Sequence, residues 1–137
     1  MKTIDRKAIM YLNLFEKTTR VRCKSCFSYN NMLIFFVPKP FVYRAVGENG
    51  NNIKELSAIL KKRIKVVGTP EIERDFEKFI FEIISPITVR NIEINNNEII
   101  ISADMQSRAS LIGRDKIKLG ELSKIVREVL GRGLRIV

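Results

Sequence analysis

Apolar residues recur along the chain with two different periods, and each change of period marks a new element. Residues 4–15 keep the three-to-four spacing of one buried helix face, and Thr3 stands before them as an N-cap. This helix should end near Thr19. Residues 20–29 then alternate between apolar and polar, which predicts a half-buried strand. The chain therefore opens with a helix followed by a strand.

A turn, a second strand and a helical pair come next. Asn30 and Asn31 favour a tight turn, because Asn tolerates left-handed backbone. Met32–Val37 is rich in β-branched and aromatic residues and predicts a buried strand. A short helix over 41–46 and an amphipathic one over 52–63 follow, and residues 64–67 form a third strand. The predicted order is helix, strand, strand, helix, helix, strand.

The second half of the chain repeats this order. Thr69 is the expected N-cap of a helix that ends before Pro86, with apolar positions at Ile72, Phe76, Phe79, Ile80 and Ile83. Two strands over 87–94 and 98–103 and a short helix over 105–112 follow. A longer helix then carries Leu119, Leu122, Ile125, Val126 and Val129 on one face, and residues 134–137 make the last strand.

The two halves superpose at an offset of 66 residues, which indicates an internal duplication. Met32–Val37 falls on residues 98–103, and Gly47 falls on Gly113. The last strand alone slips further, from 64–67 to 134–137, because the final helix is longer. We therefore expect an α+β protein of two tandem α-β-β-α-α-β units, residues 1–68 and 69–137, each with a three-stranded sheet packed by helices.

Two glycines, Gly47 and Gly50, stand between the short helix and the amphipathic helix of the first unit. Glycine lets the backbone turn sharply and approach a ligand with no Cβ in the way. The following helix exposes N–H groups at its start, where its dipole also favours an anion. This stretch is therefore a candidate phosphate contact.

The net charge of +10 sharpens that interpretation. Residues 1–67 carry 14 Lys/Arg and 4 Asp/Glu, whereas residues 68–137 carry 11 of each. Excess positive charge most simply indicates a polyanionic partner, usually nucleic acid. A solvated lysine-rich face, as on thermophile proteins, would give the same count.

The string Val46-Gly47-Glu48-Asn49-Gly50-Asn51-Asn52-Ile53 resembles the Ile-Gly-x-x-Gly-x-x-Ile signature of KH domains. The element order is similar to the type II KH arrangement, in which an extra helix and strand precede a β-α-α-β core. That resemblance implies single-stranded RNA held at the Gly-x-x-Gly loop. Two such units with almost no linker resemble the KH pair of NusA transcription factors, and the chain as a whole resembles the short archaeal NusA-like proteins.

Two departures from the family pattern concern the loops. Glu48 stands where KH loops commonly carry Lys or Arg, so an anionic side chain faces the expected phosphate path. In the second unit the last glycine is replaced, which gives Gly113-Arg114-Asp115-Lys116. That loop keeps positive charge but loses the conformational freedom of glycine at its fourth position.

The expected RNA groove combines backbone N–H groups at the loop, an apolar floor for bases that includes Val66, and a basic rim that includes Lys65. The residues expected to bind RNA are, in the first unit, Lys39, Arg44, Val46, Gly47, Glu48, Asn49, Gly50, Asn51, Ile53, Lys54, Lys61, Lys62 and Arg63 and, in the second, Arg108, Gly113, Arg114, Asp115, Lys116 and Lys118.

Catalytic and metal chemistry find little support. The chain has no histidine, and Cys23 and Cys26 alone cannot complete a zinc site. We expect structural thiols with Cys23 facing the core, and leave open a local disulfide or a zinc site shared in a symmetric dimer. The carboxylates over 71–77 are interpreted as exposed helix surface or as a docking face for a basic partner. We predict no enzyme, no cofactor and no metal.

The resemblance implies a role in transcription termination or elongation control, with single-stranded RNA as partner and RNA polymerase or other transcription factors as further candidates. The same surface would suit an rRNA-binding ribosome-assembly factor. A third reading is a protein-interaction module whose KH grooves have lapsed, with the glycines merely turning a helix hairpin. The longest apolar run, Met32–Val37, is far too short to span a membrane, so we expect a cytoplasmic protein without a membrane partner.

Overall fold

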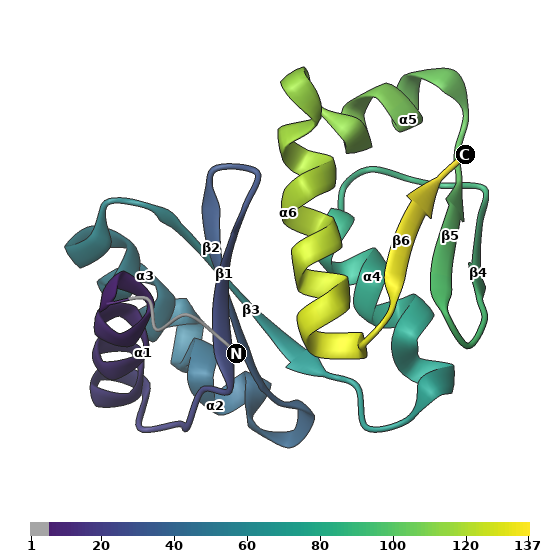
Figure 1. Ribbon diagram of the computed structural model, residues 1–137. Coiled ribbons are helices and arrows are strands. Elements are labelled where there is room, and N and C mark those ends of the chain that lie inside the picture. Colours follow the sequence, from purple (N-terminus) through teal and green to yellow (C-terminus); the bar gives the residue numbers. More distant parts are fainter. Residues whose placement is uncertain (1–5) are drawn as a thin grey trace. The chain divides into compact units, whose positions relative to one another are not determined.

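The computed structural model describes residues 6–137 and divides into two compact units, Met1–Thr69 and Pro70–Val137. Thr3 and Ile4, the expected N-cap and first apolar position, lie outside the described residues. Each unit contains one three-stranded sheet with its helices on one face (Figure 1). The predicted α+β class with two α-β-β-α-α-β units is confirmed.

The first unit follows the predicted order of elements. Its elements are α1 (Arg6–Thr19), β1 (Ser25–Tyr29), β2 (Met32–Pro38), α2 (Val42–Val46), α3 (Asn51–Leu60) and β3 (Arg63–Thr69), with 3-10 turns at Lys39–Phe41 and Glu48–Gly50. The sheet order is β1-β2-β3, with β1 antiparallel and β3 parallel to β2. Asn30 and Asn31 both have positive φ, 50° and 60°, so the predicted asparagine turn joins β1 to β2.

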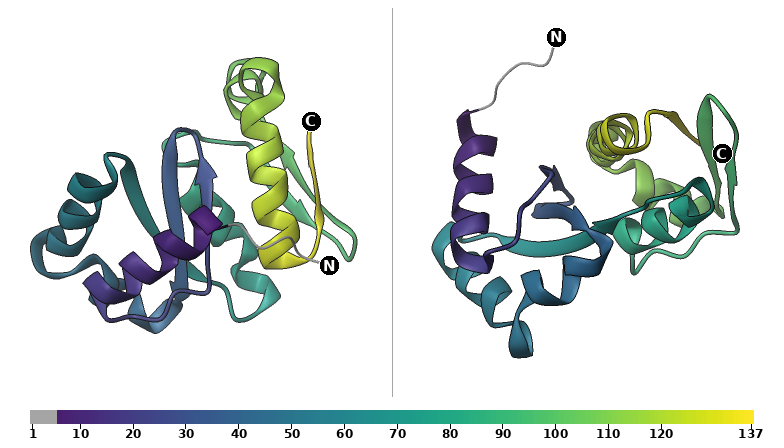
Figure 2. Two further views of the ribbon diagram at one scale, coloured as in Figure 1. Left: turned by 60° about the vertical axis from the view of Figure 1, so that its left-hand side comes forward. Right: turned by 90° about the horizontal axis from the view of Figure 1, so that it is seen from below.

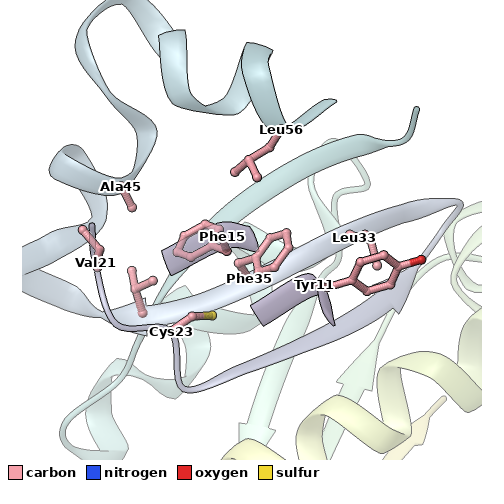
Figure 3. Packing of buried hydrophobic residues seen from close by; sticks show 9 residues of the cluster. Tyr11, Phe15, Val21, Cys23, Leu33, Phe35, Ala45 and Leu56 are labelled. Carbon is pink, nitrogen blue, oxygen red and sulfur yellow. The ribbon is translucent and has the colours of Figure 1, made fainter. Parts of the chain in front are cut away.

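The core of the first unit lies between the sheet and its three helices (Figure 3). Phe15 of α1 stacks on Phe35 of β2, with ring centroids 4.4 Å apart and an interplanar angle of 16°. The other buried members of this cluster are Tyr11, Val21, Cys23, Leu33, Val37, Ala45 and Leu56. Both helices that flank the glycines are thus anchored, Ala45 on α2 and Leu56 on α3.

The second unit repeats the arrangement with its own residues. Its elements are α4 (Phe76–Ile84), β4 (Asn91–Ile94), β5 (Glu98–Ser102), α5 (Met105–Ile112), α6 (Ile117–Ile125) and β6 (Gly133–Ile136), with 3-10 turns at Glu73–Asp75 and Arg114–Lys116 and a π-helical turn at Val126–Leu130. The sheet order is β4-β5-β6, again antiparallel and then parallel. Figure 2 shows α4 and α6 on the same side of this sheet.

The strand registers confirm the duplication and its slip. In the first sheet Leu33 pairs with Ile64, and in the second Ile99 pairs with Leu134. The offset is therefore 66 residues in the central strand and 70 in the last strand. The final helix of the second unit is therefore longer by four residues, slightly more than one α-helical turn of 3.6 residues. The π-helical turn at the end of α6 takes up this excess.

Two element boundaries in the first unit differ from the prediction. The strand expected over 20–29 begins only at Ser25, because further pairing would set Cys23 against Pro38, which has no N–H to donate. The helix expected to reach Arg63 ends at Leu60. There Lys61 turns left-handed at φ 55°, and the Ser57 hydroxyl bonds the carbonyl of Lys62 at 2.8 Å.

Two boundaries in the second unit also differ. Thr69 is not the N-cap of a helix, because it ends β3 opposite Pro38; α4 begins only at Phe76, and the expected core residue Ile72 is exposed. The strand expected over 87–94 is confined to Asn91–Ile94. Its partner β5 ends at Ser102, after which the chain turns to start α5.

Candidate nucleic-acid interface

The two glycine-led connections follow the same backbone path. We call Gly47–Gly50, between α2 and α3, the first link, and Gly113–Lys116, between α5 and α6, the second link. The leading glycines have φ/ψ of 83°/163° and 74°/173°. The third residues, Asn49 and Asp115, have 55°/26° and 56°/24°, and the fourth residues have 70°/20° and 60°/24°. The duplication therefore preserved the conformation as well as the position of the link.

Glycine is required at the first position of each link. The backbone of Gly47 lies in a region that only glycine adopts readily. A Cβ there would lie 2.9 Å from Asn52 Cγ and 3.0 Å from the Asn52 backbone nitrogen. At Gly113 it would lie 2.9 Å from Lys118 Cγ. The start of the second helix packs directly against the leading glycine in both units.

The fourth position has different demands. A Cβ on Gly50 would meet nothing within 4 Å, so the only cost of a side chain there is the left-handed backbone. Lys116 adopts this conformation in the second link and is exposed. The loss of the second glycine that the sequence showed has therefore not changed the backbone path.

Each link is followed by a helix whose N-terminus has no side-chain cap. α3 begins behind Gly50 and α6 behind Lys116, and neither residue makes a side-chain capping bond, as is also the case at the starts of α2 and α4. The contrast is α5, where the Asp104 carboxylate accepts a 2.7 Å bond from the Ser107 N–H, which holds the pKa of Asp104 below its usual value. Uncapped N–H groups at a positive dipole end can receive an anion.

The charges around the two links differ in sign. The first link carries only Glu48, with Arg44 in the last turn of α2 and Lys54 in the first turn of α3, all three exposed. The second link carries Arg114, Asp115 and Lys116. Lys118 adds a further ammonium group, and its methylenes cover Gly113. The first link is thus locally acidic with basic flanks, and the second is basic in itself.

Several expected site residues lie apart from the links. Lys61 and Lys62 follow the C-terminal end of α3, about 15 Å along its axis from the first link. Arg63 donates from Nη2 to the Asn30 carbonyl at 3.0 Å, which ties β3 to the β1–β2 turn. Lys39 lies beside Gly68, where β3 passes closely under the start of α2. The predicted basic rim is therefore spread along the unit.

The predicted apolar floor and the remaining residues near the links are placed as follows. Val46 and Ile53 are half-buried at the edges of the first link, whereas Val66 packs against the apolar cluster of the first unit. Asn51 begins α3 and is exposed. Arg108 lies on α5, more than one turn before the second link, and is half-buried. All three predicted floor residues are thus half-buried, and Val46 and Ile53 are the two that flank the first link.

Two residues near the first link were missed by sequence reasoning. Asn52 Nδ2 donates to the Arg44 carbonyl at 3.3 Å, which ties α3 back to the last turn of α2. Tyr43 lies on the same turn and is 80% exposed, the largest exposed fraction among the exposed large hydrophobic residues described. The sequence feature that could have shown Tyr43 to be exposed is its position between the inward-facing Val42 and Ala45.

The cysteines behave as structural thiols. Neither Cys23 nor Cys26 takes part in a disulfide, so the local disulfide is not formed. Cys23 is buried, as predicted, and its Sγ–H faces the carbonyls of Ser25 and Phe36 at 3.1 and 3.4 Å. Burial raises the pKa of this thiol to about 12, which makes it unreactive at neutral pH.

Across residues 6–137 no group of three or more His, Cys, Asp or Glu side chains is arranged to hold a metal ion. In the same residues no helix combines the length and apolarity needed to cross a bilayer.

Comparisons with known proteins point in one direction. The chain is 24% identical over 107 residues to "Probable transcription termination protein NusA" of Methanococcus vannielii, a match that covers 77% of this chain and 60% of the relative. It is 29% identical over 89 residues to the protein of the same name from Methanocaldococcus jannaschii, covering 65% of this chain and 47% of that one. The chain spans about half the length of the curated relatives it matches.

A structural comparison supports the fold. The crystal structure of APE1850 matches with a TM-score of 0.67 and 23% sequence identity, over 98% of this chain and 100% of that one. No protein-family model matches the chain. The predicted resemblance is thus confirmed at the level of sequence similarity: the chain is similar to archaeal NusA proteins over part of its length, and its two α-β-β-α-α-β units are consistent with a tandem KH-like fold.

Proposed function

We propose that the chain binds single-stranded RNA through its two links and acts, without enzymatic activity, in transcription termination or elongation control in the cytoplasm. The observation that carries this proposal is the link built twice. Different residues at three of four positions reproduce the same backbone path, and each link leads into an uncapped helix. Each link places the positive end of a helix dipole directly behind an exposed turn, an arrangement that favours an anion.

Charge and relatedness support the same proposal. A net charge of +10 favours a polyanionic partner, and the relatives named above are described as transcription termination proteins. RNA polymerase and other transcription factors are proposed as further partners on the strength of those names alone. The KH-like groove would hold RNA by its backbone, with bases resting on Val46 and Ile53.

The test is the affinity for an unstructured, end-labelled RNA of about 20 nucleotides, measured by fluorescence anisotropy at about 50 and 200 mM salt. We expect binding that weakens as salt rises, and weaker binding of a duplex of the same sequence. No binding, or binding that ignores salt, would contradict the proposal and favour a protein-interaction role instead.

A further inference from the structure

Tyr43 is an exposed aromatic ring placed one helical turn before the first link. Its carbonyl accepts the Gly47 N–H at 3.1 Å, so the residue belongs to the turn that ends at the leading glycine. Val42 and Val46 are half-buried and Ala45 is fully buried, which leaves Tyr43 and Arg44 on the outward side of α2. Tyr43 thus presents its ring to solvent directly beside the candidate phosphate contact.

The turn that carries Tyr43 is tied to the helix that follows the link. Asn52 Nδ2 donates to the Arg44 carbonyl at 3.3 Å, which joins the start of α3 to the end of α2. One helical turn is about 5.4 Å along the axis. The ring therefore lies within reach of the base of a nucleotide whose phosphate contacts the link.

The second unit lacks this feature at the matching positions. Ala109 takes the place of Tyr43 and accepts the equivalent bond from Gly113 N–H at 3.0 Å, while Ser110 takes the place of Arg44. The two units therefore differ in kind. The first offers an aromatic ring beside an acidic link, whereas the second offers Ala109 and Ser110 on the helix before a basic link and the exposed aliphatic Ile117 after it.

We propose that Tyr43 stacks on a base of the bound RNA, so that the first unit contributes base stacking while the second contributes mainly phosphate contacts. This inference rests on the proposed RNA binding. Base–aromatic stacking needs no particular base, and the neighbouring Arg44 adds a guanidinium plane and a positive charge. Stacking would compensate for the repulsion between Glu48 and the phosphates of the first link.

Intrinsic fluorescence gives a direct readout, because the chain has no tryptophan and only three tyrosines. Tyr11 and Tyr29 are buried, and Tyr43 alone is exposed. RNA binding should quench tyrosine emission in a saturable way, after correction for RNA absorbance. In Tyr43→Phe the quenching should disappear, because the reporter is gone, while the ring that stacks is retained.

Affinity measurements complete the test. Tyr43→Ala, which installs the residue of the second unit, should weaken RNA binding roughly 5- to 150-fold with an unchanged salt dependence. Tyr43→Phe should keep most of the affinity, and Phe81→Ala, which removes an exposed ring from α4, should leave it unchanged. An RNA with abasic residues should bind the wild type and Tyr43→Ala equally.

The outcomes separate the two proposals. If the wild type binds RNA and Tyr43→Ala binds it with the same affinity, the stacking proposal is wrong and RNA binding stands. The same holds if Tyr43→Phe loses as much RNA affinity as Tyr43→Ala. If the wild type binds no RNA, the proposed function fails and stacking fails with it. Circular dichroism of Tyr43→Ala should match the wild type, since the replaced side chain is exposed.

Discussion

The first and second links share a backbone path but not a sequence. Their leading glycines adopt the same conformation, which only glycine adopts readily, and are packed against the same position of the following helix, Asn52 or Lys118. Their fourth residues, Gly50 and Lys116, share a left-handed conformation that faces open space. The comparison shows that in a Gly-x-x-Gly link the first glycine is a steric requirement, whereas the second is a matter of backbone preference. It also separates geometry, which both links keep, from charge, which differs.

The largest effect should follow substitution of the leading glycines. Gly47→Ala would force a Cβ against a backbone nitrogen in a glycine-only conformation, and we expect a loss of about 2–3 kcal/mol in the free energy of unfolding. Gly113→Ala should cost less, because the nearest atoms belong to the Lys118 side chain, which can move. Urea denaturation measures both.

The control for these glycines is Gly120→Ala, in the interior of α6, where a Cβ meets nothing within 4 Å. It should stabilise the protein by about 0.5–1 kcal/mol. If Gly47→Ala were as stable as the wild type, the steric requirement at the first position would be disproved.

A second contrast concerns the arginine that fastens the hairpin turn in each unit. Arg132 donates from Nε to the Asn95 carbonyl at 2.8 Å, forms a 3.2 Å ion pair with Glu73, and lies over the Phe76 ring at 4.9 Å. Its side chain is only 14% exposed. Arg132→Ala should therefore reduce the free energy of unfolding by about 2 kcal/mol.

Arg63 makes a single exposed bond to the Asn30 carbonyl, so Arg63→Ala should cost only about 0.5–1 kcal/mol. Arg132→Lys keeps the charge but loses the planar fork, and its unfolding free energy should fall between the wild type and Arg132→Ala. Equal losses for Arg63→Ala and Arg132→Ala in urea denaturation would refute this difference between the units.

The smallest effect is expected from exchanging the fourth residues. Gly50→Lys should lower the free energy of unfolding by roughly 1 kcal/mol, because a side chain enters a left-handed position. Lys116→Gly should raise it by roughly 0.5 kcal/mol, since relief of that strain is partly offset by a more flexible unfolded chain. Thermal unfolding should show a lower midpoint temperature for Gly50→Lys and a higher one for Lys116→Gly. Shifts of the same sign would show that the two positions are not equivalent.

Much of this architecture was predictable because the same order of elements occurs in both halves of the sequence. The 66-residue offset, the slip of the last strand to 70 and the buried strand Met32–Val37 all follow from hydrophobic spacing. Boundaries were less predictable where pairing partners decide them. Thr69 resembles a helix cap in sequence, but the parallel ladder with Pro38 extends β3 to include it.

The site was predictable in its chemistry and less so in its layout. The glycines and the neighbouring charges could be read from spacing, but composition does not show that Lys61 and Lys62 lie at the far end of α3. Nor does it show that Lys116 can reproduce the backbone of Gly50, because that depends on the open space around the fourth position. Tyr43 escaped notice because an aromatic residue in a short helix is usually part of the core.

The most direct test of the central claim, that both links receive RNA phosphates, is the RNA affinity of the double variant Gly50→Asp, Lys116→Asp. Both positions are left-handed, which Asp tolerates. Gly50→Asn, Lys116→Asn is the matched control with the same backbone demand and no added negative charge. We predict that the Asp variant keeps the wild-type circular dichroism but binds RNA at least about tenfold more weakly than the Asn control, with a shallower salt dependence. Equal affinities for the Asp and Asn variants would contradict the claim.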